Sequence, residues 1–157
     1  MNEPLNTPPY SEQSEQAVLG ALLKNNDLFD DVAEVIVSED FYNRGHRLIF
    51  NAISEEVKQG HAVDVTTIAN KPDIDLSYCV NLARNCPASA NATRYAVIVK
   101  NKSLCRQLIG ASNEIQDLAF GYVENVDQLV GDAERKLSAV SERLLVSNQD
   151  NSAKTIL

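Results

Sequence analysis

The chain has 157 residues, enough for one domain or for a compact domain with an appendage. Its hydrophobic content of 44% supports a real core, and 6% aromatic residues without tryptophan indicate an aliphatic, helical one. No apolar run is long enough to cross a bilayer, and the first residues lack the basic and apolar regions of a signal peptide. Three cysteines, odd in number and not paired by spacing, fit a reducing compartment, so we expect a cytoplasmic protein.

The net charge of −8 is unevenly distributed. Residues 1–90 carry six Lys/Arg and 14 Asp/Glu, whereas residues 91–157 carry eight of each. Because cations hold backbone phosphates, the acidic portion is a poor nucleic-acid surface. The acidity is explained equally well by solubility and by a negative face that meets a basic protein partner or repels DNA.

Residues 1–11 hold three prolines and no periodicity, which predicts a flexible, extended lead-in. Residues 12–90 then read as a globular helical head. Its first helix, over about residues 15–24, is apolar almost all round, which is typical of a helix buried on most sides. Gly20 in its middle indicates close packing against another helix.

Four further short helices complete the predicted head. They cover about residues 28–36, 46–59, 65–70 and 76–85. His46 is most simply a residue of a first helical turn, rather than a ligand or a catalytic group.

Residues 91–146 carry the strongest pattern, a long helix and a return helix joined by a five-residue turn. Apolar residues recur at alternating spacings of three and four, a period of about 3.5 that is typical of a seam between helices. Such a short turn makes the two helices an antiparallel hairpin. The seam residues, which are our candidate interface, are Val97, Asn101, Leu104, Leu108, Ala111, Ile115, Leu118, Val126, Val130, Ala133, Leu137, Val140 and Leu144.

Two helices alone do not bury an apolar surface with two sides. Ile109, Leu129 and Leu145 add apolar area beside the seam. The hairpin therefore packs either on the preceding head, as in an ordinary bundle, or on a second copy of itself. The regular period, and the absence of another helix-forming segment, favour self-association. Asn101 is a polar residue on the seam, and such a residue fixes the register of the paired helices at a cost in stability.

Residues 147–157 lose the pattern and read as the start of a linker. They are polar at first and turn apolar at residues 155–157. We therefore expect the chain to be the front piece of a longer protein.

No catalytic, cofactor-binding or metal-binding constellation is predicted. The sequence has no GxxxxGK[ST], GxGxxG, GxSxG, HExxH or CxxC pattern, and its two histidines stand far apart. Arg94, Lys102 and Arg106 make a modest cationic strip on the long helix. A DNA-binding strip is conceivable there, but the lack of interleaved aromatics favours pairing with acidic neighbours.

Several segments, taken in order, resemble the N-terminal domain of DnaB-type replicative DNA helicases over nearly the whole chain. They are residues 9–20 (PYSEQSEQAVLG), 40–42 with 46–50 (DFY and HRLIF), 64–68 (DVTTI), 87–91 (PASAN) and 95–99 (YAVIV). These are similar to the family's P…EAEQAVLG, DFY…H..IF, DLITL and TPSAAN…YA.IV. Residues 70–75 are shorter than the usual connection, and Cys86 replaces the usual threonine, as in a divergent phage or plasmid member.

The resemblance implies an all-α fold, a small globular helical bundle followed by an antiparallel hairpin. It implies that hairpins of neighbouring subunits associate into the collar of a ring-shaped hexamer, often a trimer of dimers. In the family this collar encircles DNA and docks primase and, in some systems, a loader, while ATP and magnesium serve a C-terminal motor domain. The chain would then assemble and dock partners without catalysis and with weak or no direct DNA binding.

Two other functions stay open. One is a stand-alone regulator or loader-like protein that binds a helicase, and the other is a helical DNA-binding module that uses the cationic strip.

Overall fold

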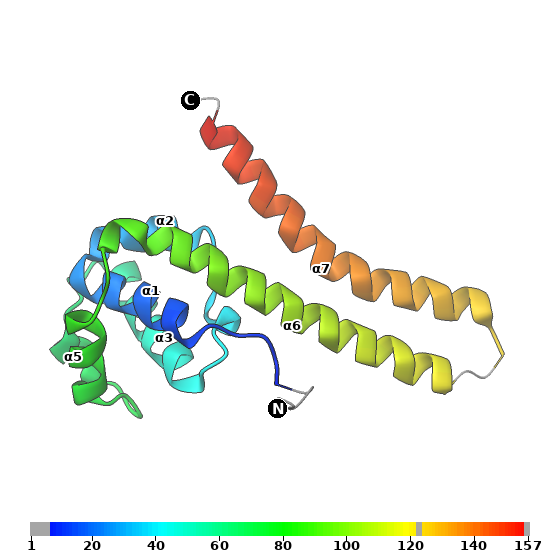
Figure 1. Cartoon of the computed structure of the whole chain (residues 1–157), viewed down its shortest axis with the longest axis horizontal. Coiled ribbons are helices and arrows are strands. Elements are labelled where there is room, and N and C mark those ends of the chain that lie inside the picture. The colour runs from blue at the N-terminus through cyan, green and yellow to red at the C-terminus, as the bar shows by residue number, and fades with distance from the viewer. Residues whose placement is uncertain (1–6, 122–123, 156–157) are drawn as a thin grey trace, which may run out of the picture. The chain divides into compact units, whose positions relative to one another are not determined.

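The computed structural model describes residues 7–121 and 124–155, with side chains described as far as Leu144. All regular structure in these residues is helical, so the predicted all-α fold is confirmed (Figure 1). The elements in order are α1 (Glu12–Lys24), the 3-10 turn η1 (Asn26–Leu28), α2 (Phe29–Ala33), η2 (Ser38–Asp40), α3 (Arg44–Lys58), α4 (Val65–Ala69), α5 (Leu76–Arg84), η3 (Ser89–Asn91), α6 (Ala92–Phe120) and α7 (Val126–Thr155).

The chain divides into two compact units, Met1–Ser103 and Leu104–Leu157. We call the first the head and the second the hairpin. The core of the head is built around α1, and it includes Ala92, Ala96 and Val99 from the first turns of α6. The predicted domain limits at residues 11, 90 and 146 stay predictions.

Helix α1 begins three residues before the predicted start at residue 15, because the Ser11 hydroxyl caps it by accepting a hydrogen bond from the Ser14 amide at 3.2 Å. Val18, Leu19 and Leu22 are fully buried, which confirms that the helix is covered on most sides. The sequence pattern thus identified the central element of the head.

Gly20 explains how α5 approaches α1 so closely. A Cβ atom at this position would lie 2.3 Å from the Leu82 carbonyl oxygen, a backbone atom that does not yield easily. The close packing predicted at Gly20 is therefore confirmed.

We expect Gly20→Ala to lower the free energy of unfolding by about 1–3 kcal/mol, because the added methyl group forces the α1 and α5 backbones apart. Chemical denaturation followed by circular dichroism measures the change. Gly110→Ala is the matched control, because it is helical and a Cβ atom added there would meet no other atom within 4 Å. The control should stabilise α6 by up to about 1 kcal/mol through higher helix propensity. Equal effects of the two substitutions would contradict the close α1–α5 contact.

Helix α7 runs on to Thr155, past residue 146 where the loss of pattern predicted the end of the helix. Residues 147–155 are mostly polar but include neither glycine nor proline. Every other residue type costs at most about 0.7 kcal/mol of helix propensity relative to alanine. Polar composition alone therefore does not end a helix. The assignment of residues 147–157 as the start of a linker stays a prediction.

Candidate self-association surface

Helices α6 and α7 run antiparallel within the hairpin unit, as the short turn predicted (Figure 1). Lys136 Nζ on α7 lies 2.7 Å from Glu114 Oε2 on α6. A groove of about 740 Å³ also lies between the two helices. It is lined by Gln107, Gly110, Ala111, Glu114, Leu118, Asp132, Arg135, Lys136, Ala139 and Val140. Later residues of α6 thus face earlier residues of α7.

The predicted seam divides into two sets of residues. The first set is turned away from solvent: Leu104 and Ala111 are each only 8% exposed. Ile115, Leu118, Ala133 and Val140 are half-buried. These side chains are sheltered within one chain, so they have little area left for a partner.

The second set is exposed. It consists of Val97, Asn101, Leu108, Val126, Val130, Leu137 and Leu144. The six apolar members keep between 41% and 53% of their surface in contact with solvent. Large exposed apolar patches mark interaction sites, and these side chains are the candidates for such a patch. Their role in contacts between subunits stays a prediction.

Ile109, which the sequence places beside the seam, is 49% exposed. The periodic pattern missed two further exposed apolar side chains on α6: Ile98 is 39% exposed, and Phe120 at the end of the helix is 90% exposed. A search for one seam at spacings of three and four passes over residues that lie one position beside it. The signal that could have found Ile98 is the adjacent pair of apolar residues Val97-Ile98.

The cationic strip is less open than its sequence suggests. Arg94 is exposed, but Lys102 and Arg106 are half-buried. Near the groove, Lys136 pairs with Glu114, and Arg135 pairs with Asp132. These two pairs lie outside the strip, and the use of the strip for DNA stays a prediction.

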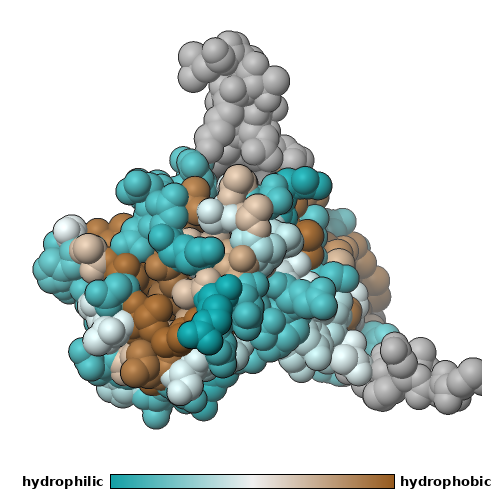
Figure 2. Space-filling view, turned by 60° about the vertical axis from the view of Figure 1, so that its left-hand side comes forward, coloured by the Kyte–Doolittle hydropathy of each residue, from teal (hydrophilic) through white to brown (hydrophobic). Residues whose placement is uncertain are grey.

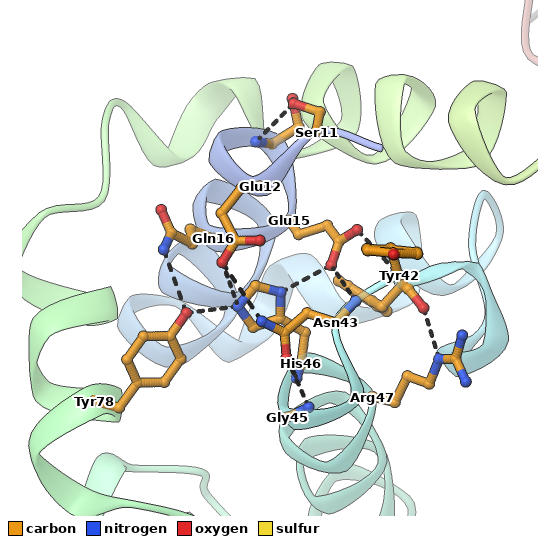
Figure 3. Close-up of polar contacts among 12 residues, drawn as sticks. Ser11, Glu12, Glu15, Gln16, Tyr42, Asn43, Gly45, His46, Arg47 and Tyr78 are labelled. Carbon is orange, nitrogen blue, oxygen red and sulfur yellow. Dashed lines mark hydrogen bonds and ion pairs between the residues drawn. The ribbon is translucent and has the colours of Figure 1, made fainter. Parts of the chain in front are cut away.

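A buried polar cluster in the head centres on His46, the first-turn residue of α3 (Figure 3). Its Nδ1 lies 2.8 Å from Glu15 Oε1 on α1, and its Nε2 lies 2.6 Å from the hydroxyl of Tyr78 on α5. Glu15 also accepts hydrogen bonds from the backbone amides of Tyr42 and Asn43, at 2.9 and 3.2 Å. The cluster therefore joins three helices and the loop before α3.

The geometry of this cluster is that of a support rather than of a reactive site. With the proton on Nδ1, His46 donates to Glu15 and accepts from Tyr78, so both ring nitrogens are used. Burial raises the pKa of Tyr78, which disfavours its ionised form. Within the part of the chain that the structure describes, no group of three or more His, Cys, Asp or Glu side chains is placed to hold a metal ion.

The head also has a cavity of about 360 Å³ between α1, α5 and the start of α6. It is lined by Gln13, Gln16, Ala17, Tyr78, Asn81, Leu82, Asn85, Cys86, Pro87 and Tyr95. Figure 2 shows apolar side chains gathered within a largely hydrophilic surface on the side turned forward. The lining of the 360 Å³ cavity carries no charged side chain that would hold a phosphate.

None of the helices in residues 7–121 and 124–155 is both long enough and apolar enough to span a membrane.

Comparison with known proteins adds to this geometry. The profile of the family described as "DnaB-like helicase N terminal domain" matches residues 7–101. The replicative DNA helicase DnaB of Geobacillus stearothermophilus is 34% identical over 144 residues, which cover 87% of the chain. The DnaB helicase of Pasteurella multocida is 30% identical over 151 residues, or 90% of the chain. The chain spans only 32% of the length of each relative.

Solved structures show the same fold. The N-terminal domain of DnaB helicase from Mycobacterium tuberculosis superposes with a TM-score of 0.78 at 28% identity, over 85% of this chain and 99% of that one. The corresponding domain from Helicobacter pylori, whose structure was described with its interactions with primase, gives a TM-score of 0.63 at 25% identity. That match covers 69% of this chain and 90% of the other.

Proposed function

Because the chain belongs to the DnaB-like helicase N-terminal domain family, we propose that it is the assembly and partner-docking domain of a hexameric replicative DNA helicase. The observation that carries this proposal is the set of exposed apolar side chains on α6 and α7. This domain works in the cytoplasm and contributes no catalytic group. ATP and magnesium act in the motor domain of the parent protein.

Self-association through the hairpin explains why the exposed set remains in contact with solvent in one chain. Full burial of a valine or leucine side chain contributes about 1.5–3 kcal/mol, and Leu108, Val130 and Leu137 each have nearly half of their surface left to bury. Several such side chains from two copies can offset the entropy lost on association. Pairs of hairpins then build the trimer of dimers that forms the collar of the ring.

Docking of primase is the second part of the proposal. It is supported by the Helicobacter pylori domain described with primase. A helicase loader is a further partner of the same collar. The DNA passes through the ring with weak or no direct contact, which suits a head with more acidic than basic residues.

Sedimentation velocity of the chain mixed with primase from the same source tests the docking. We expect a complex that sediments faster than either protein alone. Leu137→Asp, which changes an exposed residue of the hairpin, shows whether docking needs paired hairpins: weakened binding would mean that it does. If no complex forms at concentrations where the chain self-associates, primase docking is wrong and assembly alone remains.

A further inference from the structure

The cavity between α1, α5 and the start of α6 has a lining that is polar but carries no formal charge. Four side-chain amides, two tyrosines and one proline form most of it. A cationic ligand would find no carboxylate in this lining, and the excess of acidic residues in the head would repel an anion. The cavity therefore suits an uncharged ligand that makes hydrogen bonds.

The amides place hydrogen-bond donors on two walls of the cavity. Gln13 on α1 and Asn81 and Asn85 at α5 are exposed, and none of these three side chains has a hydrogen-bond partner within the residues that the structure describes. Each amide carries two N–H donors beside its carbonyl acceptor. A ligand rich in carbonyl groups would thus meet open donors from both helices.

The aromatic walls of the cavity are held in position by the rest of the head. The Tyr78 hydroxyl lies 3.3 Å from Gln16 Nε2 and 2.6 Å from His46 Nε2, and the Tyr78 ring stacks on His46 with the ring centroids 5.8 Å apart (Figure 3). Tyr95 is half-buried and packs against the hydrophobic core. Rings that need no ordering when a ligand binds lower the entropy cost of binding, so the site is preorganised.

A proline-rich peptide has the chemistry that these walls complement. A segment in the polyproline II conformation makes no internal hydrogen bonds, so its carbonyl groups remain open to donors. Proline has no backbone N–H and therefore brings no donor that needs an acceptor. Its ring packs against aromatic side chains, and aromatic-lined grooves recognise such segments in several classes of domain. Tyr78, Tyr95 and Pro87 supply comparable surfaces here.

We propose that this cavity binds an uncharged, proline-rich segment of another protein in the polyproline II conformation. At about 360 Å³ the cavity is at the small end of the range of about 300–1,000 Å³ for ligand pockets, so it takes a short segment. The chain's own Pro8 and Pro9 are half-buried where they stand, next to Tyr10, whose ring stacks on Tyr42 at 4.4 Å. The occupant is therefore a partner, and its binding is independent of self-association through the hairpin.

Hexaproline with blocked ends is the probe, titrated into the ¹⁵N-labelled full chain and followed by two-dimensional nuclear magnetic resonance. The peptide has no backbone N–H, so every N–H signal of the chain stays free of overlap. We expect saturable shifts in the side-chain amide signals of Gln13, Asn81 and Asn85. A blocked glycine–serine peptide of equal length is flexible and has no rings, and it should produce no such shifts at the same concentration.

Asn81→Asp tests the donors on α5. It removes two N–H groups and presents a carboxylate to the carbonyl oxygens of the peptide, so the dissociation constant should rise about tenfold or more. Asn51→Asp is the matched control, because it makes the same change at an exposed position of α3 that does not line the cavity. Its dissociation constant should equal that of the unchanged chain.

The absence of saturable shifts up to several millimolar hexaproline would overturn the proposal. Shifts that map outside the cavity, or binding that Asn81→Asp and Asn51→Asp affect equally, would overturn it too. Equal binding of the glycine–serine peptide would contradict the assignment to proline. A six-residue oligothymidine that shifts the same signals when hexaproline does not would assign the tyrosines to base stacking instead.

Discussion

Glu15→Ala should lower the free energy of unfolding of the head by about 3–5 kcal/mol, because several donors lose their acceptor and each such loss at a buried site costs about 1–3 kcal/mol. The Glu15 side chain is only 2% exposed and accepts from the His46 ring and from the backbone amides of Tyr42 and Asn43. Without the carboxylate, the buried His46 ring and the backbone amides of Tyr42 and Asn43 lose their acceptor. Urea unfolding followed by far-ultraviolet circular dichroism measures the loss.

Two comparisons sharpen this test. Glu15→Gln keeps one acceptor oxygen and should cost less than alanine does. Glu39→Ala removes a carboxylate elsewhere in the head, outside the cluster, and should change stability by less than about 0.5 kcal/mol. If Glu15→Ala is as mild as Glu39→Ala, the cluster does not support the head.

Leu108→Asp and Leu137→Asp should each weaken self-association by several kcal/mol, because each places an unpaired charge in a buried interface. In the single chain these leucines are 44% and 43% exposed, so the folded subunit tolerates the change and its helical content is retained. Sedimentation equilibrium gives the dissociation constant, and circular dichroism confirms the fold.

Ser138→Asp is the control for these variants. It adds the same charge to α7, beside Leu137 in sequence but about 100° away round the helix. Its dissociation constant should stay close to that of the unchanged chain. If Leu108→Asp and Leu137→Asp associate as tightly as the control does, neither leucine belongs to the interface.

The hairpin shows how far periodicity carries a prediction. A period of about 3.5 residues located both helices, because apolar side chains on a helix must share a side to be buried together. It did not show that Leu104 and Ala111 are sheltered in one chain while Leu108 and Leu137 are exposed. Spacing records which residues share a side, but the neighbour that covers that side is set by tertiary packing.

The polar cluster was not predictable in the same way. Glu15 and His46 are 31 residues apart, and Tyr78 lies another 32 residues along the chain. Contacts across such distances leave no local pattern, so His46 could be placed on its helix but not given its partners. Gly20 was the opposite case: a costly residue in an otherwise apolar helix indicated a close contact, which Leu82 supplies.

The molar mass of the unchanged chain, measured by light scattering over a wide concentration series, tests self-association most directly. Exposed apolar side chains on the hairpin predict a mass that rises with concentration to at least that of a dimer. A mass that stays at 17.3 kDa up to the highest concentration would contradict an assembly role for the hairpin.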